Sequence, residues 1–220
     1  MDRAGLVALG DSITYGEGGI VLGADGRSWA LWLAMALDLP YTNYAVPGVG
    51  APHVLEVQLP RVRRAYDLGC LYIGVNDVRA VDFRLDAYAR DVRLALAGLG
   101  ASCARLLVCA LPLDLGRPRA GGKVGEANAV IRAAAGEAGA AVCELADLRG
   151  RRSILPDAVH PTALGQLEIA DRAARALGAD VRPSALVDVD GSRAGRARFA
   201  RGWGRAWVRD VARRGRERVR

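Results

Sequence analysis

The chain has 220 residues, of which 51% are apolar, so it can bury the core of one domain without disulfides or metal ions. No apolar run reaches the roughly 20 residues that cross a bilayer, and the first residues lack a signal peptide, so we expect a cytoplasmic protein. The net charge of +7 arises at the C-terminus: residues 182–220 hold 12 basic and 4 acidic residues, whereas residues 1–181 hold 19 and 20. The basic isoelectric point therefore does not indicate that the main part of the chain binds nucleic acid.

Short apolar runs alternate with longer helical patterns over the first 181 residues. Strands are predicted at residues 6–9, 42–46, 70–73, 106–110 and 141–145. Helices are predicted at residues 28–38, 53–64, 85–99, 123–138 and 161–177. Strands that are apolar throughout and are separated by helices indicate a parallel sheet covered on both faces. The predicted fold is therefore an α/β three-layer αβα sandwich with a five-stranded sheet.

Residues suited to chemistry follow the first three predicted strands. Gly10, Asp11 and Ser12 follow the first strand, where a serine can direct its hydroxyl into a cleft and Gly10 relieves crowding in the turn. Gly48 follows the second strand and Asn76 the third. Ligands in open α/β sheets bind beyond the carboxyl ends of the strands, so Ser12, Gly48 and Asn76 are expected at one shared edge.

A serine hydroxyl is a weak nucleophile until a base removes its proton, so Ser12 needs a partner. Asp157 and His160 lie in the loop before the last predicted helix and supply a candidate base and carboxylate. The chain has only two histidines, and His53, at the start of an amphipathic stretch, is interpreted as structural. A developing oxyanion would find three donors: the backbone N–H of Ser12, the backbone N–H of Gly48 and the side-chain amide of Asn76.

Asp11 and Asp77 each flank a candidate site residue. We interpret both as structural carboxylates that fix their turns by accepting backbone N–H bonds. No spacing of histidine, cysteine and acidic residues is typical of a metal site, and no glycine-rich loop has a nucleotide-binding form, so no cofactor is expected. The four cysteines lie in or beside apolar strands, which favours reduced, buried thiols over disulfides.

Four short segments of the sequence resemble, in this order, the four sequence blocks of the SGNH (GDSL-type) hydrolase superfamily of serine esterases and lipases. They contain Ser12, Gly48, Asn76 and the pair Asp157 and His160. The resemblance covers about residues 4–178, with one departure at Ala45, where the family usually has glycine. It implies a flavodoxin-like strand order 2-1-3-4-5. It also implies that Ser12 is the nucleophile, that His160 is the general base, and that Asp157 orients the imidazole.

The expected function is hydrolysis of short- to medium-chain acyl esters through a covalent acyl-enzyme. The loops at residues 15–27 and 78–84 are expected to shape the acyl pocket, and their apolar side chains favour an apolar acyl group. Acyl transfer to an alcohol or amine through the same residues is a second hypothesis. A third, from another class, is a peripheral binding protein that works through its C-terminal residues.

We predict two parts of the chain: a catalytic domain at residues 1–181 and a basic extension at residues 182–220. Within residues 196–220, arginines alternate with Phe199, Trp203, Trp207 and Val211 at a spacing of four, which suggests one helical face. That face can pack on the domain, contact an anionic membrane surface, or remain disordered. Nucleic acid is a less favoured partner.

Overall fold

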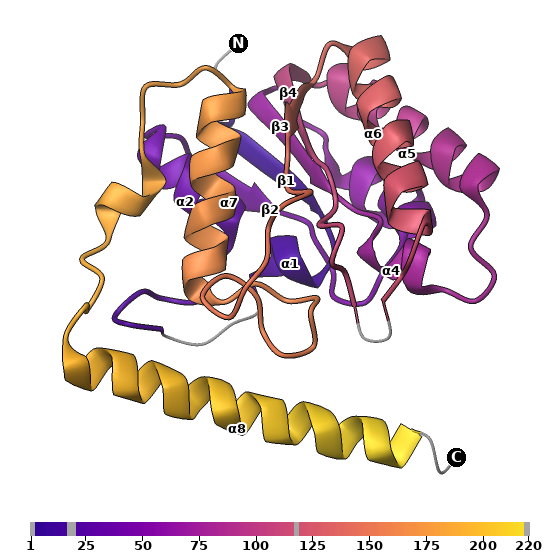
Figure 1. The fold of residues 1–220 in the computed structure, drawn as a ribbon. Helices are drawn as coiled ribbons and strands as arrows, with labels where there is room; N and C mark the ends of the chain where they lie inside the picture. The colour runs from indigo at the N-terminus through magenta and orange to yellow at the C-terminus, as the bar shows by residue number, and fades with distance from the viewer. Residues whose placement is uncertain (1–2, 17–20, 117–118, 218–220) are drawn as a thin grey trace.

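The computed structural model describes residues 3–16, 21–116 and 119–217, with side chains up to residue 212 (Figure 1). Five parallel strands form one sheet: β1 (Leu6–Gly10), β2 (Tyr41–Asn43), β3 (Tyr66–Tyr72), β4 (Cys103–Cys109) and β5 (Ala141–Cys143). Their order is β2-β1-β3-β4-β5, which confirms the predicted flavodoxin-like topology. Every residue of the inner strand β1 is buried, as expected for a sheet covered on both faces.

Two pairs of helices enclose the sheet and confirm the three-layer architecture (Figure 1). Helices α2 (Trp29–Ala36) and α7 (Ala163–Ala176) pack together on one face. Helices α5 (Leu85–Gly100) and α6 (Lys123–Ala138) pack together on the other. Shorter elements complete the described fold: α1 (Ser12–Tyr15), α3 (Ala51–His53), η1 (Val54–Gln58), η2 (Leu59–Arg61), α4 (Val75–Arg79) and η3 (Pro183–Leu186).

The predicted helix at residues 53–64 is the clearest local difference. The chain there forms one turn of α-helix, a π-helical turn and a 3-10 turn, and it ends at Arg61. Pro60 lies within the last turn, and its ring removes an N–H that a continuing helix would need. The irregular winding places Gln58 against Gly10, at the carboxyl end of β1.

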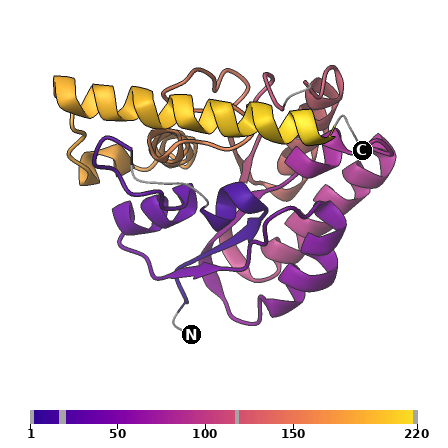
Figure 2. The same ribbon diagram turned by 90° about the horizontal axis from the view of Figure 1, so that it is seen from below.

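The C-terminal residues form a long helix, α8 (Arg193–Glu217), which crosses the same edge of the molecule as the α1 and α4 turns (Figures 1 and 2). The apolar residues that are spaced by four along it are not equally buried. Phe199 and Trp203 are half-buried against the domain, whereas Trp207 and Val211 are 44% and 41% exposed. Each step of four residues rotates a helical position by about 40°, so a series of four drifts away from the docked side. Within the described ranges, no helix is long and apolar enough to cross a membrane.

Candidate active site

Ser12 is the first residue of α1, directly beyond the carboxyl end of β1. Gly10 makes the sharp turn before it with a φ of +152°, and a Cβ there would lie 2.3 Å from the carbonyl oxygen of Tyr72. Asp11 caps the helix, since its Oδ1 accepts a hydrogen bond of 3.0 Å from the N–H of Ile13. The turn therefore requires glycine before the cap, and it holds Ser12 at the sheet edge.

Two fully buried glutamines brace this turn. Gln58 accepts a hydrogen bond from the N–H of Gly10 at 2.9 Å and donates to its carbonyl oxygen at 2.8 Å. Gln166 of α7 donates to the carbonyl oxygen of Ile13 at 3.0 Å and accepts from the N–H of Trp29 at 2.9 Å. These amides satisfy backbone groups on both sides of Ser12 that water cannot reach. Sequence reasoning did not assign either role, because nothing in a single sequence marks which glutamine becomes buried.

His160 and Asp157 lie beside Ser12, although 148 residues separate His160 from it in the chain. The distance from Ser12 Oγ to His160 Nε2 is 3.0 Å, and that from His160 Nδ1 to Asp157 Oδ2 is 2.6 Å. A neutral imidazole that donates from Nδ1 to the carboxylate leaves Nε2 as an acceptor for the serine hydroxyl. The geometry therefore joins the three predicted residues in one chain of hydrogen bonds.

The loop that carries Asp157 is held by hydrogen bonds between the Asp157 side chain and the backbone of the same loop. Asp157 Oδ1 accepts from the N–H groups of Val159 and His160 at 3.0 and 3.1 Å, while Ala158 between them has a φ of +56°. Burial alone would raise the pKa of Asp157, but the hydrogen bond and charge of His160, with the two N–H donors, outweigh burial and lower it. The carboxylate thus stays ionised opposite the imidazole.

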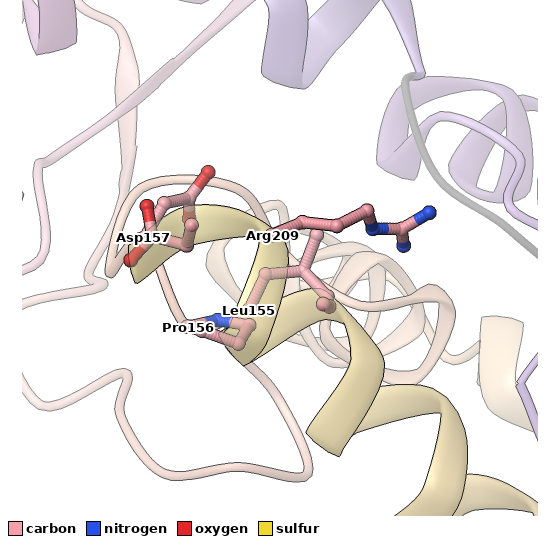
Figure 3. Close-up of a pocket in the computed structure, with 6 residues that line it drawn as sticks. Leu155, Pro156, Asp157 and Arg209 are labelled. Carbon is pink, nitrogen blue, oxygen red and sulfur yellow. The ribbon is translucent and has the colours of Figure 1, made fainter. Parts of the chain in front are cut away.

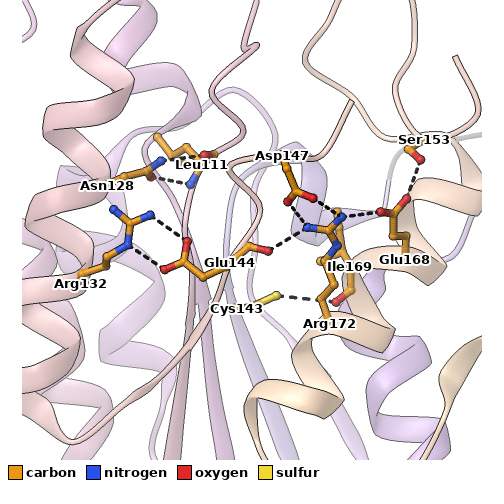
Figure 4. A network of polar contacts seen from close by, with 10 residues as sticks. All are labelled: Leu111, Asn128, Arg132, Cys143, Glu144, Asp147, Ser153, Glu168, Ile169 and Arg172. Atoms are coloured by element: carbon orange, nitrogen blue, oxygen red, sulfur yellow. Dashed lines mark hydrogen bonds and ion pairs between the residues drawn. The ribbon is translucent and has the colours of Figure 1, made fainter. Parts of the chain in front are cut away.

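Arg172 of α7 anchors the segment that leads into this loop (Figure 4). Its guanidinium contacts Asp147 at 2.5 Å and Glu168 at 2.7 Å, and Glu168 accepts from the hydroxyl of Ser153 at 2.6 Å. The chain between residues 147 and 153 is thereby fixed to the helix behind it. These contacts hold the approach to Asp157 at several points.

Two of the three candidate oxyanion donors, Gly48 and Asn76, lie on segments that are fastened together. Asn76 Nδ2 donates to the carbonyl oxygen of Val49 at 2.9 Å, and Asp77 Oδ1 accepts from the N–H of Ala51 at 2.9 Å. An amide NH2 carries two hydrogens, so Asn76 keeps one for a further acceptor. Gly48 lies at this junction with a φ of +79°, and a Cβ there would meet no atom within 4 Å. The space beside Gly48 is therefore open.

Asp77 also fixes the Gly48 loop through the N–H of Ala51, a contact that sequence reasoning did not foresee. Ala45, the departure from the family pattern, is accommodated without a positive φ, and its N–H donates to Asn43 Oδ1 at 2.9 Å.

His53 is not part of the chain of hydrogen bonds that includes Ser12; its Nδ1 lies 3.4 Å from Gln58 Nε2. Among the described residues, no group of His, Cys, Asp or Glu side chains could hold a metal ion.

Asp11 is a buried carboxyl beside the candidate nucleophile. Burial raises its pKa from 3.8 to about 7, against the opposing effects of the Ile13 N–H and of His160. Its Oδ2 has no hydrogen-bond partner among the described residues. Asp11 thus caps the helix through Oδ1, while its Oδ2 is buried without a hydrogen bond to replace those it would make with water.

Helix α8 contributes walls to cavities beside this site, which sequence reasoning did not foresee. A cavity of about 220 Å³ separates Leu155, Pro156 and Asp157 from Ala206 and Arg209, whose guanidinium points away from Asp157 (Figure 3). A larger one, of about 510 Å³, lies between α8 and the loops that face it, with mainly apolar walls that include Val21, Leu22, Leu155, Phe199 and Trp203.

Only part of the predicted acyl pocket is found in these walls. Val21 and Leu22 line the larger cavity, but Tyr15 is 56% exposed and Val81 is fully exposed. Phe83 packs against Tyr88. Residues 17–20 of the predicted loop lie outside the described residues. No residue of the second expected loop, at residues 78–84, lines either of these two cavities.

The described fold is thus a doubly wound α/β sheet with a serine, a histidine and an aspartate joined by hydrogen bonds at the carboxyl ends of its strands. The chain belongs to the GDSL-like lipase/acylhydrolase family, whose model matches residues 8–167. It is accordingly a carboxylic ester hydrolase.

Solved structures share the fold of this chain. Axe2, an acetylxylan esterase from Geobacillus stearothermophilus, is 18% identical with a TM-score of 0.63, and the match covers 79% of this chain and 94% of Axe2. LAE5, an alpha/beta hydrolase enzyme from the metagenome of Lake Arreo in Spain, is 17% identical with a TM-score of 0.64, over 80% of this chain and 95% of LAE5. At these identities the likeness concerns the fold. No curated protein sequence matches significantly.

Proposed function

We propose that the chain hydrolyses esters through a covalent acyl-enzyme formed on Ser12. His160 removes the hydroxyl proton as Ser12 attacks the ester carbonyl, and it then protonates the departing alcohol. Asp157 keeps the imidazole in the required tautomer and stabilises its charged form. Water, activated by the same histidine, releases the acid and restores Ser12.

The negative charge that develops on the carbonyl oxygen is assigned to three donors. These are the N–H groups of Ser12 and Gly48 and the second amide hydrogen of Asn76. The bond from Asn76 to Val49 holds that amide beside the Gly48 loop before substrate binds. Donors fixed in advance do not have to reorganise during the reaction, which is why such sites lower the barrier.

The observation that supports this mechanism most directly is the pair of distances through His160, 3.0 Å to Ser12 and 2.6 Å to Asp157. The test is initial-rate hydrolysis of p-nitrophenyl acetate, butyrate, octanoate and palmitate by wild type and by Ser12→Ala. The matched control is Ser102→Ala, in the turn before β4 at the opposite end of the sheet. We expect turnover that Ser12→Ala abolishes and Ser102→Ala preserves, with the acetate to octanoate esters preferred. Full activity in folded Ser12→Ala would refute the mechanism.

Release to water rather than to another acceptor is part of the proposal. Adding methanol or an amine during turnover measures how the acyl group is divided between acceptors. Free acid should remain the main product at low acceptor concentration. A predominant new ester or amide would instead assign the chain to acyl transfer by the same residues.

We further propose that the outer side of α8 contacts anionic membrane surfaces while the catalytic domain, assigned to residues 1–181, acts beside it. Trp207, Val208 and Val211 are 44%, 60% and 41% exposed on this helix. Arg201 and Arg205 are also exposed and make no ion pair with a described residue. Apolar side chains beside arginines are typical of helices that lie in a membrane interface.

Sedimentation with vesicles tests this contact in the full-length chain. Wild type should sediment with vesicles rich in phosphatidylglycerol and remain in solution with phosphatidylcholine alone. The double variant Trp207→Ser, Val211→Ser should lose most of this binding. Leu94→Ser, which removes an apolar side chain of 51% exposure from α5, is the control. Equal sedimentation of both variants would exclude α8 as the membrane contact. Residues 218–220 lie outside the described residues and carry no part of this proposal.

A further inference from the structure

A second large cavity, of about 520 Å³, lies between α4 and the start of α6. Its walls include Asn76, Arg79, Arg119 and Lys123, and its other lining residues are small or apolar. No carboxylate lines it among the described residues. The cavity differs in chemistry from the apolar one under α8, although the volume of each lies in the range of small-molecule sites.

The positive charges of this cavity are only partly neutralised. Arg119 pairs with Asp114 at 2.9 Å, on the protein surface. Lys123 Nζ donates to the carbonyl oxygen of Ala80 at 3.1 Å, which satisfies one of its three N–H bonds. Arg79 is exposed and forms no ion pair with any described residue. Two cations thus remain available to an incoming anion.

Asn76 connects this cavity to the proposed reaction centre. It is at once a wall of the cavity and the side chain assigned to the oxyanion. Arg79 follows it by three residues in the same short helix, so the two side chains lie on one side of α4. A substituent of the substrate that extends past Asn76 therefore enters the cavity with the unpaired cations.

We propose that this cavity binds an anionic group, a carboxylate or a phosphate, carried by one half of the ester substrate. The inference rests on the proposed function, since Asn76 marks where the scissile carbonyl lies. Arg79 contributes a planar guanidinium suited to two oxygens of such a group, and Lys123 contributes a point charge. The enzyme would then favour negatively charged esters over neutral esters of the same size.

The first experiment compares matched substrates. In the acyl half, 4-nitrophenyl hemisuccinate is compared with 4-nitrophenyl butyrate. In the alcohol half, 4-acetoxybenzoate and 4-acetoxyphenyl phosphate are compared with phenyl acetate. We expect wild type to prefer the anionic ester in one of these two sets. Equal kcat/KM for neutral and anionic esters in both sets would overturn the proposal.

Variants then locate the preference. Arg79→Gln should lower kcat/KM for the favoured anionic ester by about tenfold to a hundredfold, the usual effect of losing a hydrogen bond to a charged group. The neutral ester should change less than twofold, and Arg79→Lys should recover part of the loss. Arg64→Gln removes an exposed arginine before β3, at the opposite end of the sheet, and should leave the preference intact. Equal losses on neutral and anionic esters in Arg79→Gln would overturn the assignment.

Failure of the cavity and failure of the mechanism can be told apart. Hydrolysis of neutral esters that depends on Ser12 but shows no charge preference would leave the mechanism standing and remove the subsite. If no ester is turned over, calorimetric binding of the same esters to wild type and Arg79→Gln decides the subsite alone. Weaker binding of the anionic ester to Arg79→Gln would support it, and equal binding would overturn it.

Discussion

Asp11 caps the turn that positions the candidate nucleophile, and its burial lowers the stability of the folded protein when the carboxyl is ionised. The carboxyl caps α1 through one oxygen, while the other is buried without a partner, and its pKa rises from 3.8 to about 7. In the unfolded chain the same group loses its proton near pH 4. Between these two values the folded state holds a proton that the unfolded state has released. Stability from this residue is therefore complete below pH 4 and falls as the pH rises to about 7.

We predict that Asp11→Asn removes this pH dependence. The Asn side-chain oxygen can still accept from Ile13, but it does not ionise. The free energy of unfolding of wild type relative to Asp11→Asn should fall by roughly 4 kcal/mol between pH 4 and 8, from a pKa difference of about three units. Urea denaturation at several pH values measures it. The exposed Asp82→Asn should follow wild type, and a constant difference between wild type and Asp11→Asn would contradict the prediction.

Asn76 is expected to act on the reaction as well as on the Gly48 loop, whose Val49 carbonyl oxygen it bonds. Asn76→Ala should lower kcat by about 10² to 10³ with little change in KM, because the amide would stabilise the oxyanion more than the ground state. Asn128→Ala is the matched control, since Asn128 of α6 also bonds a backbone, that of Leu111, and has no proposed part in the reaction. Similar losses of kcat in two folded variants would indicate that Asn76 has only a structural role.

At the scale of an element, α8 is docked by a few contacts near its centre. Trp203 Nε1 donates to the carbonyl oxygen of Ile154 at 3.4 Å, and the Arg151 guanidinium lies 5.6 Å from the centre of its ring. Glycines at positions 202 and 204 lower the helical propensity on both sides. The helix therefore depends on docking, and Ile154 belongs to the loop that leads to Asp157.

We predict that Trp203→Ala loosens α8, whereas Trp207→Ala does not. Both changes remove an indole from the same helix, but only Trp203 is packed against the domain, and its loss should cost about 1–3 kcal/mol of local stability. Hydrogen exchange should become faster across α8 in Trp203→Ala alone. Equal exchange in the two variants would show that the contact with Ile154 does not hold the helix.

At the scale of the whole molecule, the four free thiols test the packing of the sheet. Burial raises the pKa of Cys70 and Cys109 well above the ordinary value, and it raises that of the half-buried Cys103 to about 11. We predict that Ellman's reagent reacts slowly with the native protein at pH 8, and with Cys103 first, because little thiolate is present. All four thiols should react in urea. Cys103→Ser should remove the fastest native phase, and rapid reaction of several native thiols would contradict the packing described here.

The distribution of charge also depends on the whole molecule. Along the chain, residues 1–181 are nearly neutral, which gave no reason to expect a charged site. In the fold, Arg79 comes from one segment and Arg119 and Lys123 from another, and the three meet in one cavity beside Asn76. The acidic residues that make the net charge of residues 1–181 nearly zero lie elsewhere. Glu137 and Glu144, for example, form ion pairs on the molecular surface near α6. A net charge per segment does not reveal such a cluster.

The sequence by itself determined the αβα class, the strand order through its resemblance, and the residues that meet at the sheet edge. The spacing of apolar residues and the positions where strands end are local properties of the sequence. In a parallel sheet they are enough to place Ser12, Gly48 and Asn76 at one edge. Only the tertiary structure decided the roles of Gln58 and Gln166, the fastening of the Gly48 loop by Asp77, and the side of α8 that packs. These depend on which polar groups become buried and on how a helix rotates against its neighbours, and both are set by contacts between residues far apart in the chain.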